Sequence, residues 1–200
     1  PDVTSLDRLF NPRAILIAGA SGEHSRPGGQ VVKALNEQGY RGTIYPVNPK
    51  YPELAGHRCY ASVDDVPDGC DLAVVALPAP QVPGVIAQCA SRGIRYAVVL
   101  GGGFRESGVA GERIEAAMLE AARAGGVRLI GPNCLGLVNV SARVYAAFGG
   151  LTRPPMLEAG GVSAVLQSGG VGPALLIRCA QAGVGFRYVV TSGNEADIST

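Results

Sequence analysis

The sequence lacks several features that would point to particular classes of protein. It has no tryptophan, only two histidines, and no uninterrupted run of about 18 apolar residues, so we expect no transmembrane helix. Its 17 basic and 16 acidic residues are mixed along the chain and leave a net charge of +1. Because no basic stripe is present, a nucleic-acid partner is not expected. The start, Pro1-Asp2-Val3-Thr4, shows no signal-peptide pattern.

Cysteine is present but not in a pattern that builds a framework. The five cysteines are scattered, and no pair has C-x-x-C spacing. An odd, scattered set argues against a disulfide network and against a structural zinc site. We therefore expect reduced thiols, a cytoplasmic location and no metal-binding residues.

Short apolar runs alternate with helical patterns through the first three quarters of the chain. The runs are too short for helices and nearly continuous in apolar residues, which is typical of strands buried on both faces of a parallel sheet. These expected strands cover 14–18, 43–47, 72–77, 96–100 and 127–130. The expected helices cover 30–38, 82–91 and 112–124. The alternation predicts an α/β fold, a doubly wound parallel sheet of the Rossmann-like type.

The alternation stops and then restarts. Gly149-Gly150 and Arg153-Pro154-Pro155 interrupt it, after which a strand at 162–166, a helix at 171–182 and a strand at 186–191 follow. We predict a nucleotide-binding domain at 1–148, a linker at 149–158, and the start of a second, flavodoxin-like α/β domain at 159–200. The alternative is that the last unit extends the first sheet.

The strongest candidate site follows the first strand. The segment 19–29 contains Gly19-Ala20-Ser21-Gly22, then Arg26, then Gly28-Gly29 at the start of a helix. Glycines in this position let backbone amides close on a phosphate, and the helix N-terminus favours negative charge. The spacing is not G-x-G-x-x-G, so the segment predicts a longer phosphate-binding loop and not a regular dinucleotide fingerprint. At Gly22 we expect the backbone to approach the phosphate and positive φ to exclude a β-branched residue.

The end of the second strand discriminates between ligands. In NAD-binding domains an acidic residue here binds the ribose hydroxyls. This chain has Asn48-Pro49-Lys50 instead, with a cation and no acid. A lysine suits a phosphorylated ribose or a pyrophosphate, so CoA and NADP both remain open and NAD is disfavoured.

The later strands end in segments rich in proline or glycine. They are Pro78-Ala79-Pro80, Leu100-Gly101-Gly102 and Gly131-Pro132-Asn133-Cys134. Carboxyl ends of parallel strands are where ligands bind in open α/β sheets. Cys134 has no histidine near it in sequence, and we interpret it as a buried, unreactive thiol.

These segments together resemble a known family. Gly-Ala-Ser after the first strand, Val47-Asn48-Pro49-Lys50, Pro78-Ala79-Pro80, Gly131-Pro132-Asn133-Cys134-Leu135-Gly136, Gln167-Ser168-Gly169-Gly170-Val171-Gly172 and Ser192-Gly193-Asn194-Glu195-Ala196-Asp197 occur in that order. The ordered set resembles the NDP-forming acyl-CoA synthetases, relatives of the succinyl-CoA synthetase α subunit. The resemblance covers nearly all 200 residues but matches only the front part of that subunit.

The resemblance implies a specific function. The first domain would hold CoA near Gly19, Ala20, Ser21, Gly22, Arg26, Asn48, Lys50, Pro78, Leu100, Gly101 and Gly102. Asn133 and Cys134 would lie near the active site, and Ser168, Gly169 and Gly170 would face a phosphorylated histidine. The intact protein would join a small carboxylic acid to CoA with ATP and Mg²⁺, using an ATP-grasp domain or subunit.

This sequence departs from the family at the phospho-accepting histidine. That residue lies further along the second domain, whereas the two histidines here are His24 and His57. We therefore expect the chain to be a truncated part that does not catalyse alone and has no catalytic residue of its own. Two alternatives stay open, a non-catalytic CoA-sensing module as in protein acetyltransferase-like proteins, and an NADP-binding oxidoreductase. Homo-oligomer formation is left open as well.

Overall fold

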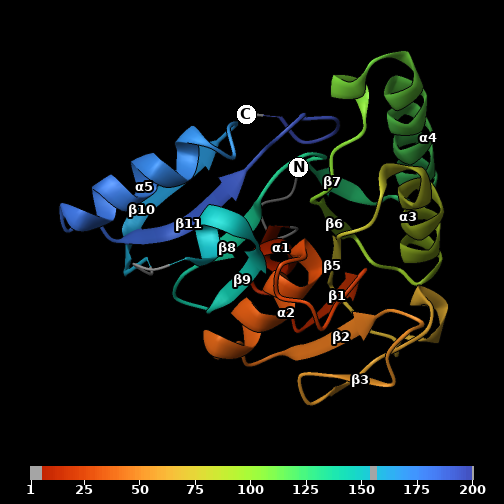
Figure 1. The fold of residues 1–200 in the computed structure, drawn as a ribbon, viewed down its shortest axis with the longest axis horizontal. Coiled ribbons are helices and arrows are strands. Elements are labelled where there is room, and N and C mark those ends of the chain that lie inside the picture. The colour runs from red at the N-terminus through yellow and green to blue at the C-terminus, as the bar shows by residue number, and fades with distance from the viewer. Residues whose placement is uncertain (1–5, 154–156, 200) are drawn as a thin grey trace.

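The computed structural model describes residues 6–153 and 157–199, and these form two principal sheets with helices packed against them (Figure 1). Two helices, α3 (Val82–Ser91) and α4 (Val109–Gly125), lie side by side on one face of the first sheet. The opposite face is covered by α2 (Pro27–Glu37) and by the second sheet.

The first sheet has five parallel strands in the order β2 (Thr43–Val47), β1 (Ala14–Ala18), β5 (Leu72–Val75), β6 (Tyr96–Val99) and β7 (Arg128–Ile130). Every residue of β1, β5 and β6 is buried, as a parallel sheet covered on both faces requires. The chain runs from β1 to β2 on one side and then returns to β5 on the other. The predicted doubly wound sheet is thus confirmed, and the strand order reverses between β1 and β5.

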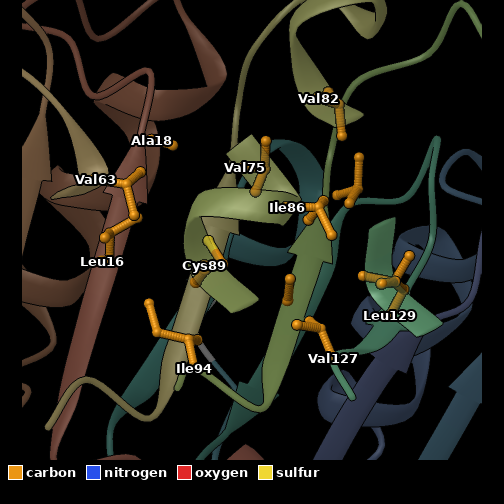
Figure 2. Close-up of a cluster of buried hydrophobic side chains, with 14 of the residues drawn as sticks. Leu16, Ala18, Val63, Val75, Val82, Ile86, Cys89, Ile94, Val127 and Leu129 are labelled. Atoms are coloured by element: carbon orange, nitrogen blue, oxygen red, sulfur yellow. The ribbon is translucent and has the colours of Figure 1, made fainter. Parts of the chain in front are cut away.

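Figure 2 shows how one face of this sheet is filled. Val82, Ile86 and Cys89 on α3 pack against strand side chains such as Leu16 and Val75. All five are nearly inaccessible to solvent. This core and its counterpart under α2 hold the parallel strands in one sheet, so their carboxyl ends meet at one edge.

The second sheet is mixed, in the order β10 (Ala159–Leu166), β11 (Phe186–Thr191), β8 (Gly136–Asn139) and β9 (Val144–Ala147). The first two strands are parallel and joined by α5 (Val171–Gln181), which confirms the predicted strand–helix–strand unit outside the first sheet. The antiparallel β8–β9 hairpin was not predicted, and β8 pairs with β11. Strands from both sides of the predicted 149–158 linker therefore share one sheet.

The described part of that linker is folded against the body of the protein. Gly149–Thr152 form a 3₁₀ helix, η5, and Leu151 is buried beside Leu176. Residues 154–156 of the predicted linker lie outside the described residues. The prediction of a domain boundary between 148 and 159 stays a prediction.

Short elements complete the chain. They are α1 (Asp7–Phe10), β3 (Glu53–Leu54), β4 (His57–Arg58), η2 (Val63–Asp65), η3 (Ala79–Gln81) and η4 (Arg105–Ser107). Within the described residues, every helix is too short or too polar to cross a lipid bilayer. Apolar side chains remain exposed on β10 and α5, among them Val165 at 56% and Val171 at 73%.

Candidate functional site

The loop after β1 is held tightly against its neighbours by the backbone of Gly19. Its φ is +84°, in the region that favours glycine, and its N–H donates to the Val47 carbonyl at 3.0 Å. A Cβ at this position would lie 2.5 Å from the Ala76 carbonyl oxygen. Only glycine therefore lets the ends of β1, β2 and β5 approach this closely.

The first turn of α2 packs directly on the same loop. A Cβ on Gly28 would lie 2.1 Å from the Gly19 carbonyl oxygen, and one on Gly29 would lie 2.2 Å from that of Glu23. Arg26 precedes the helix and Pro27 occupies its first turn, so the amides of this turn have no intrahelical acceptors. Backbone donors and the positive end of the helix dipole consequently meet at the carboxyl edge.

Gly22 does not have the backbone conformation expected of it. It is absent from the positive-φ glycines, and a Cβ there would meet Leu54 and Tyr51 at ordinary contact distances of 3.6 and 3.8 Å. The expectation of strain at Gly22 is therefore wrong. The strict need for glycine lies at Gly19, Gly28 and Gly29, because backbone atoms and not flexible side chains face those positions.

The end of β2 is tied to the glycine loop through Asn48. Its Nδ2 donates to the Ala20 carbonyl at 2.7 Å, and its Oδ1 accepts from the Lys50 amide at 3.0 Å. The Lys50 side chain is exposed and forms no ion pair within residues 6–153 and 157–199. Asn48 thus orders the backbone, and Lys50 offers an uncompensated cation beside it.

A cavity of about 310 Å³ lies where these loops meet, at the strand-order reversal between β1 and β5. Its lining residues come from the glycine loop, the start of α2 and the ends of β2 and β5, and they are Gly19, Ser21, Glu23, Arg26, Pro27, Gly28, Asn48, Lys50, Tyr51, Ala76, Leu77 and Pro78. The structure thereby brings together six predicted residues, Gly19, Ser21, Arg26, Asn48, Lys50 and Pro78.

Sequence reasoning missed several of these lining residues. Glu23 pairs with Arg26 at 3.0 Å, so the two charges largely compensate and Lys50 supplies the remaining positive charge. Tyr51 follows Lys50 directly and adds a half-buried ring to the wall. Gly28 was visible in the motif, but its close approach to Gly19 depends on the helix angle and has no sequence signal.

The turn after β6 lies next to this cavity without lining it. Among the residues that the structure describes, the cavity wall does not include the predicted Leu100, Gly101 and Gly102. A Cβ on Gly101 would lie 2.9 Å from the carbonyl oxygen of Leu77, which does line the cavity. Gly22 borders a neighbouring cavity of about 320 Å³ together with exposed His24.

Asn133 and Cys134 follow the end of β7 and have different environments. The Asn133 backbone has φ +58° after a cis Gly131–Pro132 peptide, and its Nδ2 donates to Asn194 Oδ1 at 3.3 Å. Cys134 is buried and its Sγ donates to the Val99 carbonyl at 3.4 Å. Burial raises the pKa of this thiol to about 12, so it stays protonated at neutral pH and is a poor nucleophile.

The 167–170 loop begins α5 and is capped from within. Ser168 Oγ accepts from the amides of Gly170 and Val171, each at 3.2 Å. Gly169 packs on Leu135, and Gln167 Nε2 donates to the Gly193 carbonyl at 3.1 Å. An anion arriving at this helix N-terminus would replace the long Ser168 hydrogen bonds with charge-assisted ones.

Taken together, a parallel sheet, a glycine loop that meets a helix N-terminus and a lysine at the strand-order reversal define a domain that binds phosphate-containing cofactors. Residues 13–140 match the family model of the CoA binding domain, and residues 159–200 match that of the succinyl-CoA ligase like flavodoxin domain. The chain belongs to the CoA-binding domain family, as its sequence motifs predict.

Curated and solved relatives agree with this assignment. The chain is 38% identical over 191 residues to "Acetate--CoA ligase [ADP-forming] I" of Archaeoglobus fulgidus, covering 96% of this chain and 27% of that protein. It is 37% identical over 198 residues to the alpha subunit of "Acetate--CoA ligase [ADP-forming] I" of Pyrococcus furiosus, covering 97% and 42%. The chain therefore spans well under half the length of these relatives.

A solved structure shows the same fold. The acetyl-coenzyme A synthetase 1 of Ca. Korarchaeum cryptofilum, described as dinucleotide forming and in complex with phosphate and ADP, superposes with a TM-score of 0.90 at 40% identity. The match covers 97% of this chain and 40% of that one. It includes both sheets, so the α/β fold with a second mixed sheet is that of the synthetase.

Proposed function

We propose that this chain forms the CoA-binding part of an ADP-forming acyl-CoA synthetase. The observation that carries the proposal is the charge of the cavity at the β1/β5 reversal. Glu23 and Arg26 compensate each other there, and Lys50 adds an unpaired cation at the end of β2, where NAD-binding domains have an acid. A cofactor with a phosphorylated ribose fits this charge better than NAD.

The parts of CoA correspond to distinct parts of the cavity. The amides of the first turn of α2 suit the pyrophosphate, because they present donors at a helix N-terminus that packs on the Gly19 loop. Lys50 suits the 3′-phosphate, as a point charge on a flexible stem. Leu77 and Pro78 offer apolar surface at the end of β5 that leads toward Gly101. When bound, CoA supplies the thiol that accepts an acyl group.

The similarity to ADP-forming acetate–CoA ligases supports a proposal for the reaction of the whole protein. An ADP-forming acetate–CoA ligase joins a carboxylic acid to CoA, and the corresponding reaction here would use ATP and Mg²⁺ held by an ATP-grasp domain or subunit. Ser168, Gly169 and Gly170 would present the N-terminus of α5 to a phosphoryl group. Neither His24, exposed in the glycine loop, nor His57, bonded to Asn36 at 2.8 Å, lies in that loop.

Calorimetric titration of the chain with CoA, 3′-dephospho-CoA, NADP and NAD tests the proposal. CoA should bind most tightly, and removal of its 3′-phosphate should weaken binding about 10- to 100-fold, the scale of a hydrogen bond to a charged group. Tighter binding of NAD than of CoA would refute the proposal. Tighter binding of NADP than of CoA would favour the oxidoreductase that Lys50 also permits.

A further inference from the structure

Glu106, on η4 just after the β6 glycine turn, uses both carboxylate oxygens to join two separate parts of the chain. Its Oε1 accepts from the amides of Gly103 and Phe104, at 2.5 and 3.1 Å. Its Oε2 accepts from the side-chain amide of Asn194, in the loop after β11. Burial alone would raise the pKa of Glu106, but the hydrogen bonds from Asn194 and the turn amides hold it below its ordinary value.

Asn194 is 9% exposed, and each of its polar groups has a partner. Besides Glu106, its Nδ2 approaches Glu115 Oε2 at 3.4 Å, and its Oδ1 accepts from Asn133 at 3.3 Å. Its backbone amide donates to the Pro132 carbonyl at 2.8 Å, and its carbonyl accepts from Arg105 Nη2. A side chain held in this way has one orientation, because a rotated amide would place donors against donors.

The loop that carries Asn194 also holds the loop at the start of α5. The Gly193 carbonyl accepts from Gln167 Nε2 at 3.1 Å, and the Ser192 amide donates to the Leu166 carbonyl at 2.9 Å. A Cβ on Gly193 would lie 2.3 Å from the Pro132 carbonyl oxygen. The loop that carries Asn194 therefore packs its backbone on Pro132 and accepts a hydrogen bond from the Gln167 side chain.

On its other side, the Glu106 contact reaches the cavity. The Gly101 backbone packs against the carbonyl of Leu77, a lining residue, and Glu106 fixes the amide of Gly103 two residues further on. Contacts therefore run without interruption from the cavity to the 167–170 loop. Coupling between sites is carried by packed and hydrogen-bonded groups of this kind.

We propose that Glu106 and Asn194 are positioning residues that couple occupancy of the CoA cavity to the conformation of the 167–170 loop. The inference rests on the proposed function, since CoA is the ligand of the cavity. A ligand that orders the Leu77–Gly101 contact would first order the β6 turn and then the Glu106–Asn194 hydrogen bond. The ordered Asn194 loop would in turn restrict Gln167. Because coupling is reciprocal, an anion at the start of α5 would increase CoA affinity by the same factor.

Hydrogen exchange measured by mass spectrometry, with and without CoA, tests this coupling. CoA should slow exchange at 19–29 and at 167–172 in the unmodified chain. Glu106→Gln keeps an acceptor for the turn amides but places an amide NH₂ against that of Asn194. We expect CoA to slow exchange at 19–29 in this variant as in the unmodified chain. At 167–172 the CoA-dependent slowing should be at least about fivefold smaller. Glu120→Gln, the same change on the exposed side of α4, is the matched control and should respond like the unmodified chain.

The two segments separate the possible outcomes. An undiminished response at 167–172 in Glu106→Gln, or no response there in an unmodified chain that is protected at 19–29, would overturn the coupling alone. No CoA-dependent protection at 19–29 would overturn the proposed function and the coupling with it. If Glu106→Gln unfolds, Asn194→Asp gives a second test, because it removes the donor to Glu106 while keeping an acceptor for Asn133.

Discussion

Replacing Gly28 with alanine tests whether the glycine loop and α2 are packed as tightly as the structure shows. The new Cβ would lie 2.1 Å from the Gly19 carbonyl oxygen and 3.2 Å from the Ala20 Cα. Both neighbours are backbone atoms of a buried segment, so no side-chain rotation can relieve the overlap. The helix and the loop must separate by about 1 Å, which alters the place where we propose the pyrophosphate binds.

The expected effect has the opposite sign to that of an ordinary helical glycine. Alanine usually stabilises a helix by roughly 0.5–1 kcal/mol relative to glycine. Overpacking of a well-packed region costs about 1–3 kcal/mol, so we expect Gly28→Ala to lower the free energy of unfolding by an amount in that range. For a chain of this size the loss corresponds to a fall in Tm of roughly 2–12 °C.

Thermal unfolding followed by circular dichroism, with CoA titration of the folded variant, measures both consequences. Gly22→Ala is the matched control in the same loop, because its Cβ would have ordinary contacts with Leu54 and Tyr51. It should change Tm by less than about 2 °C. If Gly28→Ala raised Tm, the close packing of α2 on Gly19 would be refuted.

Three further changes have defined outcomes. Lys50→Ala should weaken CoA binding by about 1.5–3 kcal/mol with unchanged Tm, whereas Lys33→Ala, which removes an equal charge on α2, should leave CoA affinity unchanged. If both variants bound CoA as tightly as the unmodified chain, Lys50 would be a solvated surface lysine without a role in binding. Burial would raise the pKa of Asp71, but hydrogen bonds from Arg13 hold that pKa below its ordinary value. The ionised carboxylate therefore stabilises the fold above the ordinary pKa, and this stabilisation is lost as pH falls through the lowered pKa. Asp71→Asn should therefore cost about 1.5–3 kcal/mol at pH 7, and its deficit in urea unfolding should shrink toward pH 3; a deficit independent of pH would contradict the ion pair. Cys134 should resist alkylation in the native chain at pH 7.5, with modification only on unfolding, as mass spectrometry would show; rapid native labelling would contradict its burial.

The strands of the first sheet and the helices packed on it were predictable because buried positions are occupied by apolar residues in a recognisable pattern. A strand such as Ala14–Ala18 is buried on both faces and is therefore continuously apolar, so its bounds match the prediction. Val82–Ser91 likewise has a buried stripe, and its predicted bounds are the observed ones. The separate strand–helix–strand unit after residue 158 was recognised from its short apolar runs, although β10 is mostly exposed in the structure.

The β8–β9 hairpin was not predicted because its pattern is ambiguous. Gly136–Asn139 and Val144–Ala147 are each four residues long and buried throughout, so they show no period-2 alternation. Their turn uses positive φ at Arg143, a residue type that gives no turn signal. Only tertiary pairing of β8 with β11 identifies them as part of the second sheet.

The site residues that directly follow strand ends were predictable from chain order. The contacts that depend on how the elements pack were not. Gly19, Ser21 and Lys50 follow strand ends and meet because parallel strands end at one edge. The requirement for glycine at position 28 and the compensation of Arg26 by Glu23 depend on distances set by the angle of α2. Asn194 was recognised as part of a motif, but its bond to Glu106 spans 88 residues and has no local signal.

Amide chemical-shift mapping on the isotope-labelled chain tests directly whether CoA binds in the cavity at the β1/β5 reversal. Addition of CoA should shift the amides of Gly19, Ser21, Gly28 and Lys50 in a saturable manner, with smaller shifts at the opposite, amino edge of the sheet, as at Arg95. Saturable shifts confined to the amino edge, with none in the glycine loop, would contradict CoA binding in this cavity.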